Sequence, residues 1–211
     1  SGQLEHLYYG RKLHANEAVM TEKHTFIPGN TNVYNKDYSS YSLEDVCLEM
    51  SSLGKGDIRE PFIEVTYPNG SSTTDMVFDR AEIIQGKEEY DTLPGSYDDN
   101  GEVEQLVIYL KDRNYNLTLE LHYYVYEKCD IITRSAKLVN SGNESVRLER
   151  LMSMQLDLNE SDYELSFFNG AWAREMNRSR IPIRAGKYVN ESVTGTSSNR
   201  ANPFFMIGRS S

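Results

Sequence analysis

Apolar and polar residues alternate along much of this chain with a period of two, which is typical of strands that bury one face. In residues 117–126 every second side chain is large and apolar, whereas Thr118, Glu120 and His122 occupy the other face. The longest run extends from Val146 to Leu158 and is broken only at Arg150. It predicts one long strand with a buried face. Shorter runs predict strands at 4–9, 106–111, 130–139 and 204–207.

One pair of strand-like runs is joined by a strong turn signal. Phe62–Tyr67 and Thr73–Phe78 flank the sequence Pro68-Asn69-Gly70-Ser71. Asn-Gly between two such runs is typical of a β-hairpin, because both residues tolerate positive φ. We therefore predict a hairpin over residues 62–78.

A single segment has helical spacing. Leu43, Val46, Cys47 and Met50 fall at i, i+3, i+4 and i+7, after a Ser42 that resembles a helix cap. So short a pattern fits a helix of two or three turns and an irregular segment equally well, and both interpretations stay open.

Many short strands separated by polar turns predict a fold class. We expect an all-β protein, a large antiparallel β-sandwich with at most one short helix, forming a single domain over residues 1–211. The 15 tyrosines and 7 phenylalanines favour strands as well. Strand-like runs stand at both ends of the chain. We expect a piece truncated at both ends, because open strand edges need covering.

Composition excludes several classes of partner. The formal net charge of −10 opposes binding to nucleic-acid phosphates, so no DNA or RNA partner is expected. No run approaches the length of a membrane span, and no membrane partner is expected. The two cysteines, Cys47 and Cys129, lie outside any CxxC pattern and are expected to be buried, reduced thiols.

The common catalytic patterns are missing from the sequence. The four histidines form no HxH or HExxH pattern, and there is neither a GxSxG elbow nor a P-loop. We therefore expect no metal and no cofactor. The acidic pairs Glu88-Glu89 and Asp98-Asp99 are adjacent in sequence, so their carboxyl groups do not converge as glycoside cleavage requires. No catalytic residue is predicted.

Two charged or aromatic stretches are candidates for function. In Gly54–Pro61, Asp57 and Arg59 either hold the loop together, which the sequence favours, or reach a partner surface. The segment 168–175 contains Trp172, the only tryptophan, and Arg174. A lone tryptophan is equally typical of a core and of an interface centre.

These stretches belong to a set of motifs in fixed order. The set is LEHLYYGRK at 4–12, GKGDIREP at 54–61, DIITRS at 130–135, LERLMSMQLDL at 148–158, GAWARE at 170–175, GTSS at 195–198 and NPFF at 202–205. It resembles the N-terminal domain of glycoside hydrolase family 36, the bacterial and fungal α-galactosidases. The family usually has an aromatic residue where Ile58 stands.

The resemblance implies a fold and a division of labour. It implies a β-supersandwich similar to galactose mutarotase, followed in the whole enzyme by a barrel that supplies both catalytic aspartates for retaining hydrolysis of α-galactosides such as melibiose and raffinose. It also implies a homotetramer in the bacterial cytoplasm, in which this domain supports assembly and shapes the substrate pocket. By resemblance, the residues that contact the barrel or another subunit are Asp57, Arg59, Trp172, Arg174 and the loop 30–42.

Two other functions fit parts of the sequence. A carbohydrate-binding module would use exposed aromatic side chains, and Tyr34, Tyr38 and Tyr41 crowd one loop. An epimerase of free galactose follows only from fold analogy, which does not fix function, and the sequence reveals no His/Glu acid–base arrangement for it.

Overall fold

The computed structural model describes residues 1–14, 33–158, 162–195 and 200–209. The chain divides into two compact units, here called unit 1 (Ser1–Asp157) and unit 2 (Leu158–Ser211). Each unit is built from antiparallel strands, which confirms the predicted all-β class. The only helical elements in the described part are three short 3₁₀ turns, Lys36–Tyr38, Leu43–Asp45 and Glu127–Cys129.

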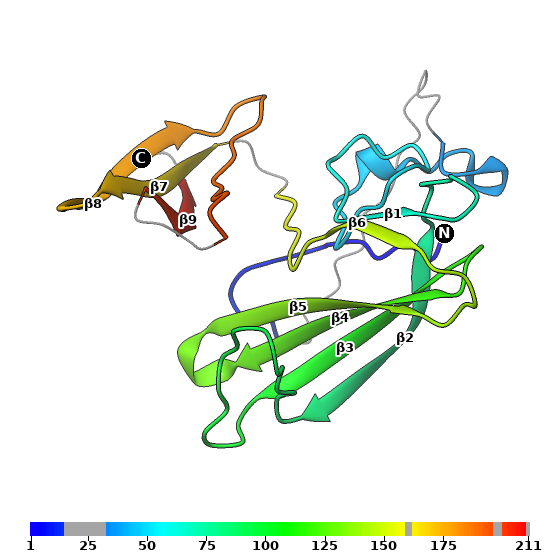
Figure 1. The fold of residues 1–211 in the computed structure, drawn as a ribbon, viewed down its shortest axis with the longest axis horizontal. Helices are drawn as coiled ribbons and strands as arrows, with labels where there is room; N and C mark the ends of the chain where they lie inside the picture. The colour runs from blue at the N-terminus through cyan, green and yellow to red at the C-terminus, as the bar shows by residue number, and fades with distance from the viewer. Residues whose placement is uncertain (15–32, 159–161, 196–199, 210–211) are drawn as a thin grey trace. The chain divides into compact units, whose positions relative to one another are not determined.

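A four-stranded antiparallel sheet forms the larger layer of unit 1. Its strands follow one another in sequence and in space: β2 (Met76–Gln85), β3 (Glu104–Asp112), β4 (Leu117–Tyr126) and β5 (Ile131–Asn140) (Figure 1). The strands predicted over 106–111, 117–126 and 130–139 are confirmed as β3, β4 and β5. Each pairs with its neighbour along the chain, so periodicity and turn residues are enough to locate them.

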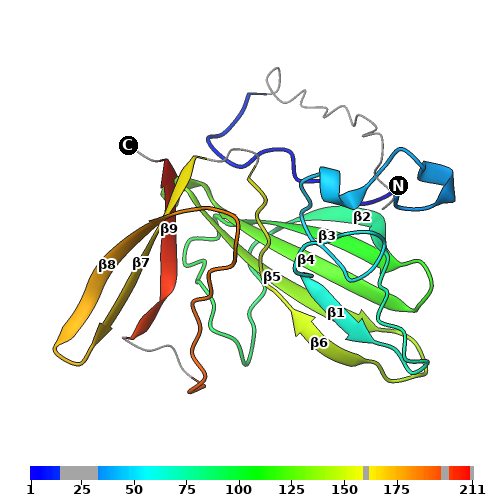
Figure 2. The same ribbon diagram turned by 90° about the horizontal axis from the view of Figure 1, so that it is seen from above.

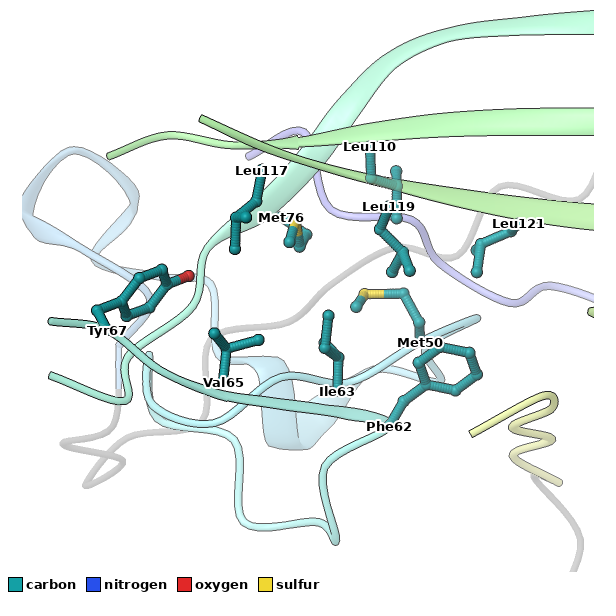
Figure 3. Close-up of a cluster of buried hydrophobic side chains, with 10 residues drawn as sticks. All are labelled: Met50, Phe62, Ile63, Val65, Tyr67, Met76, Leu110, Leu117, Leu119 and Leu121. Carbon is teal, nitrogen blue, oxygen red and sulfur yellow. The ribbon is translucent and has the colours of Figure 1, made fainter. Parts of the chain in front are cut away.

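A smaller sheet packs across this layer. β1 (Ile63–Thr66) and β6 (Arg147–Leu151) lie side by side and antiparallel (Figure 2). Figure 3 shows side chains from β1, including Ile63 and Val65, pointing toward Leu117, Leu119 and Leu121 of β4. These side chains are almost completely buried. Each contributes roughly 1.5–3 kcal/mol of hydrophobic stabilisation, so unit 1 is held together as a two-layer sandwich.

The outer face of the larger sheet is covered in part, around His122 and Tyr124 of β4. The loop that follows β2 reaches over it: the Tyr90 hydroxyl lies 2.7 Å from the hydroxyls of both Tyr124 and Ser135. His122 and Tyr124 are consequently buried, although they point away from the main core. Successive side chains of β4 therefore point alternately toward the main core and toward the covering loop, and neither face of this strand is fully solvated.

The predicted hairpin over 62–78 is wrong in its pairing. The turn exists, with the Tyr67 N–H donating to the Ser71 carbonyl and the Gly70 N–H to the Tyr67 carbonyl, both at 2.9 Å. However, β1 pairs with β6, and β2 pairs with β3. The cause lies in Thr74, whose N–H donates to Leu53 and whose carbonyl accepts from Ser52 Oγ. These bonds lead the chain from one layer to the other.

The helical interpretation of residues 42–50 is wrong beyond one 3₁₀ turn at Leu43–Asp45. The Ser42 side chain makes no cap bond, and Val46 is extended. Distant side chains bind the backbone here. The Arg59 guanidinium donates hydrogen bonds to the carbonyls of Leu43 and Val46, and the Asp157 carboxylate accepts one from the Leu48 N–H. Tertiary contacts thus replace the internal bonds of a helix.

The long strand predicted over 146–158 is also wrong, since β6 ends at Leu151. The Met152 N–H still donates to the Phe62 carbonyl at 3.0 Å, but β1 provides no partner beyond that point. Side chains hold the remainder of this segment in place: Arg134 donates to the Gln155 carbonyl, and Arg59 donates to the Asp157 carboxylate. At the start of the chain, the strand predicted over 4–9 is reduced to one bridge between Glu5 and Leu48.

Unit 2 is a three-stranded antiparallel sheet in the order β8–β7–β9. It comprises β7 (Tyr163–Ala171), β8 (Arg174–Pro182) and β9 (Ala201–Arg209). The strand predicted over 204–207 is confirmed within β9. β7 and β8 form a hairpin that the sequence pattern did not predict, with Trp172 and Ala173 at its tip.

Candidate functional site

The guanidinium of Arg59 connects three separate parts of unit 1. Its Nη1 donates to the Val46 carbonyl and to Asp157 Oδ2, both at 2.6 Å, and its Nη2 donates to the Leu43 carbonyl. Its Nε donates to Asp57 Oδ1 at 2.9 Å. The planar fork of arginine suits this set of acceptors, whereas the point charge of lysine does not. We call this arrangement the Arg59 clamp.

Asp57 faces inward. Its side chain is 0% exposed, and its Oδ1 accepts from both Nε and the N–H of Arg59. The second oxygen, Oδ2, is buried and has no hydrogen-bond partner within the described residues. The sequence prediction that Asp57 and Arg59 hold this loop together is confirmed by these bonds. The Asp57 side chain is fully buried, whereas that of Arg59 is 25% exposed.

The residue that the loop does present is Ile58. It lies between the two clamped residues, and 75% of its surface is exposed. Sequence reasoning missed it, although an apolar residue flanked by two ion-paired residues was a usable signal. The loop therefore offers a short apolar tip on a rigid base.

The backbone before Asp57 is held in an unusual conformation. Gly54, Lys55 and Gly56 all have positive φ, at 93°, 63° and 82°. Left-handed geometry at a lysine costs about 1–2 kcal/mol, and two contacts offset this cost: Lys55 Nζ lies 3.5 Å from Asp75 Oδ2 and 4.6 Å from the Tyr34 ring centroid. A side chain at Gly54 would also collide with Thr73, 2.8 Å from the Cβ position. The loop is thus preformed.

In unit 2, Trp172 lies at the tip of the β7–β8 hairpin, with 89% of its surface exposed. It is therefore not a core anchor. Ala173 has a φ of 60°, and its N–H donates to Glu175 Oε1 at 2.9 Å. Arg174 is exposed at the start of β8, directly after the tip. The structure brings Trp172 and Arg174 together at one turn, as it brings Asp57 and Arg59 together in the other unit.

The tyrosine-rich loop is mostly engaged in packing. Residues 30–32 lie outside the described part. Tyr34 is buried and donates to Asp75 Oδ1 at 2.7 Å, while Tyr41 donates to Glu5 Oε1 at 2.7 Å. Burial raises the pKa of both phenols, with the acceptor carboxylates adding to the effect. Only Tyr38 of the three leaves a large part of its ring exposed, so this loop is not an aromatic platform for sugars.

The structure places two histidines beside glutamates, an arrangement that the sequence analysis did not find. His6 Nδ1 lies 2.8 Å from Glu49 Oε2, and this carboxylate is also bound by Arg134 and Tyr123. His122 Nε2 lies 3.3 Å from Glu120 Oε2, and its Nδ1 lies 2.8 Å from Gln105 Nε2. The signal was present, because residues i and i+2 share a face of a strand. His122 is buried beneath the loop after β2 and cannot touch a sugar, so this pair gives no support to an epimerase.

Of the adjacent acidic residues, Asp98 serves the loop that contains it. Asp98 accepts from the N–H groups of Glu102 at 2.9 Å and Val103 at 3.3 Å. Among the described residues no group of three or more His, Cys, Asp or Glu side chains is arranged to hold a metal ion. In the same part of the chain no helix is long and apolar enough to cross a membrane. Neither Cys47 nor Cys129 forms a disulfide, but the prediction that both are buried is wrong, because Cys129 is exposed.

Comparison with known protein families gives a match over residues 2–211 to the glycosyl hydrolase family 36 N-terminal domain. The chain belongs to this family. The family 36 domain is 35% identical, over 98% of its length, to α-galactosidase AgaA of Geobacillus stearothermophilus. It is 34% identical, over 98% of its length, to the bifunctional α-galactosidase/sucrose kinase AgaSK of Mediterraneibacter gnavus.

Solved structures agree with this assignment. The family 36 domain superposes on the crystal structure of the α-galactosidase from Lactobacillus brevis with a TM-score of 0.91, at 34% identity, over 99% of this chain. The TM-score with AgaA is 0.90, at 33% identity. The chain spans 28% of AgaA and 22% of AgaSK, so it corresponds to about a quarter of these relatives.

Proposed function

We propose that this domain is the N-terminal, non-catalytic part of an α-galactosidase that hydrolyses terminal α-galactosides such as melibiose and raffinose with retention. The relatives named above are α-galactosidases, and AgaA variants have been crystallised in complex with stachyose and with raffinose. Within the described residues Asp98 serves its own loop, the buried His122–Glu120 pair is inaccessible to a sugar, and the Glu49 carboxylate beside His6 is engaged by Arg134 and Tyr123. The cleaving residues then belong to a barrel domain outside this chain.

The role of the domain in that enzyme is to support assembly and to shape the substrate pocket. The preformed 54–61 loop carries this proposal, because a rigid base that holds one exposed isoleucine suits an apolar contact with a partner surface. Trp172 and Arg174 form the second contact, since exposed tryptophan and arginine are enriched at interface centres. The partners are the enzyme's own barrel and further copies in a homotetramer, in the bacterial cytoplasm.

The domain boundaries follow from the same proposal. Units 1 and 2 together form one β-supersandwich domain of the galactose-mutarotase type over residues 1–211.

Galactose release tests the division of labour. The 211-residue chain is expected to release no galactose from raffinose, whereas the parent protein releases it. Detectable release by the chain alone would contradict the proposal.

Substitution in the parent protein tests the contacts. Ile58→Ser and Trp172→Ala are expected to reduce turnover of raffinose or to shift the tetramer toward smaller species in light scattering. Ile83→Ser is the matched control for the first variant, because Ile83 is 77% exposed and lies in a strand. The assembly role is wrong if both contact variants match the control in both measurements.

Replacing Asp57 and Arg59 together tests whether the rigid base matters. Loss of the clamp is expected to reduce the turnover of raffinose or to shift the tetramer toward smaller species, because Ile58 loses its fixed position. Unchanged turnover and unchanged oligomer size in this variant would show that the rigid 54–61 loop contributes to neither property.

A further inference from the structure

Two neighbouring hollows open on the loop that follows β2. The larger has a volume of about 380 Å³ and lies between residues 97–103 of this loop and the turn at 126–129 that joins β4 to β5. Its volume falls within the range of roughly 300–1,000 Å³ that is usual for small-molecule sites. Figure 1 shows the loop and the turn close together at the same end of the sheet.

The second hollow continues the first. It has a volume of about 260 Å³ and is lined by residues 87–98 of the same loop. Tyr97 and Asp98 belong to both hollows. A single ligand longer than one sugar ring can therefore contact both, with Tyr97 at the point where they meet.

The walls of these hollows are fixed by contacts that already exist. The Tyr126 hydroxyl donates to Ser96 Oγ at 2.6 Å, and Asp98 caps the turn that leads into Val103. Lys128 pairs with Glu102 across the larger hollow. Tyr90 anchors the other end of the loop on the sheet through Tyr124 and Ser135. A ligand thus meets a surface that is largely ordered in advance, which lowers the entropic cost of binding.

Several side chains that line the hollows take no part in the contacts that fix the walls. Tyr97 is 81% exposed. Within the described residues, the side chains of Tyr97, Asp99 and Asn100 make no hydrogen bond or ion pair. The larger hollow therefore combines a free aromatic ring, a free carboxylate and a free amide.

This set of groups selects the chemistry of a ligand. A metal ion is disfavoured, because the acidic residues here are not arranged as a group of three ligands. A phosphate is disfavoured by the carboxylates of Asp98, Asp99, Glu102 and Glu127. A sugar fits, since the C–H face of a pyranose packs on a tyrosine ring and its hydroxyl groups donate to carboxylate and amide oxygens.

We propose that the loop 87–103 and the turn 126–129 form an oligosaccharide-binding groove that takes α-galactosides of two or more sugar units, with Tyr97 stacking on a ring and Asp99 and Asn100 binding hydroxyls. The sugar class rests on the proposed function. Because the groove lies on this domain, the N-terminal part of the enzyme would itself bind oligosaccharide.

Calorimetric titration of the 211-residue chain with stachyose tests the groove. We expect saturable binding with a Kd on the order of 1 mM, as for an open site with few contacts, and much weaker binding of maltotetraose. Tyr97→Ala and Asp99→Ala are each expected to weaken stachyose binding at least tenfold. Tyr9→Ala is the matched control, because Tyr9 is 63% exposed and lies outside both hollows, and it leaves the affinity unchanged.

The possible outcomes are distinct. A flat titration, or equal losses in Tyr97→Ala and Tyr9→Ala, overturns the groove. Amide shifts of Asp99 and Asn100 on addition of stachyose, followed by NMR, support it independently of the variants. Release of galactose by the parent protein together with a flat titration sinks the groove alone, whereas stachyose binding by the chain without galactose release by the parent sinks the proposed function alone.

Discussion

Arg59 binds the carboxylate of Asp157, with Nη1 2.6 Å from Oδ2, and so joins the 54–61 loop to the last residue of unit 1. Because Asp157 also accepts from the Leu48 N–H, the pair stabilises a segment that has no strand partner. Two of the motifs that marked the family in the sequence, GKGDIREP and LERLMSMQLDL, meet at this ion pair. Their shared physical role is to replace sheet pairing with side-chain contacts.

Replacement of Arg59 by lysine tests the clamp. Arg59→Lys keeps the charge but loses the planar fork, and it leaves the carbonyls of Leu43 and Val46 without donors. We expect the free energy of unfolding to fall by about 2–3 kcal/mol, measured by urea denaturation followed by circular dichroism.

The control for this variant is Arg147→Lys. Arg147 pairs with Glu149 at the surface, where the same exchange should change stability by less than about 0.5 kcal/mol. Equal stabilities of the two variants would mean that the clamp contributes nothing beyond an ordinary surface ion pair.

Leu119 of β4 tests the sandwich core of unit 1. Its side chain is completely buried between the two sheets (Figure 3). Leu119→Ala leaves a cavity there and should cost about 2–5 kcal/mol of unfolding free energy in the same urea experiment. Leu93→Ala, at an exposed loop position, should cost less than about 0.5 kcal/mol. Similar losses for both would contradict the two-layer packing.

Tyr67 makes stability depend on alkaline pH. Burial, with the nearby Asp112 carboxylate, raises the pKa of Tyr67 from the ordinary value of 10.0 to about 12. A folded-state pKa above the unfolded one stabilises the fold fully below pH 10, and this stabilisation is lost as the pH rises through about 12. The shift corresponds to roughly 2–3 kcal/mol.

Spectrophotometric titration checks this expectation. One phenol should ionise near pH 12 in the folded chain, and Tyr67→Phe should remove that step. The slope of stability against pH between 10 and 12 should also become shallower in the variant. A variant with the same titration and the same slope as the parent sequence would show that Tyr67 ionises like a surface tyrosine.

Trp172 gives a direct optical signal, because it is the only tryptophan. Its exposure at the hairpin tip predicts an emission maximum close to that of free tryptophan in water, together with strong quenching by iodide. Blue-shifted, poorly quenched emission from the folded chain would place the ring in a core instead.

Thiol chemistry distinguishes the two cysteines. Cys129 is exposed and Cys47 is half-buried, and neither forms a disulfide. Reaction with a chromogenic disulfide reagent should modify Cys129 quickly and Cys47 more slowly, reaching two thiols per chain after unfolding. A count below two in the unfolded, unreduced chain would show a disulfide.

Three of the strands that the sequence predicted well are held by local contacts. β3, β4 and β5 each pair with the next strand along the chain, so alternation and turn residues suffice. The errors at 42–50 and 146–158 have a common cause, because Arg59 and Asp157 bind backbone groups far away in sequence. Periodicity contains no information on such partners.

The candidate site was predicted in part. The pattern of glycines and charges in the 54–61 loop indicated the pairing of Asp57 with Arg59, but not that Asp57 points inward and Ile58 outward. For Trp172 the sequence left core and surface equally open, since the nearby Asn169-Gly170 lies within β7 and the hairpin turns instead through Ala173 with positive φ. The Tyr97 groove depends on a loop and a distant turn meeting, which only the fold reveals.

The separation of β1 from β2 bears on how the protein folds. The strands of the meander β2–β5 pair in the order of the chain, and the turns that join β3 to β4 and β4 to β5 are short. In contrast, β1 pairs with β6, which is synthesised after the whole meander. Low contact order favours rapid formation of the meander, and the entropic cost of the long loop delays the second layer. Unit 1 should therefore pass through an early species in which the apolar face of β4 is exposed to solvent until β1 and β6 pair and pack on it.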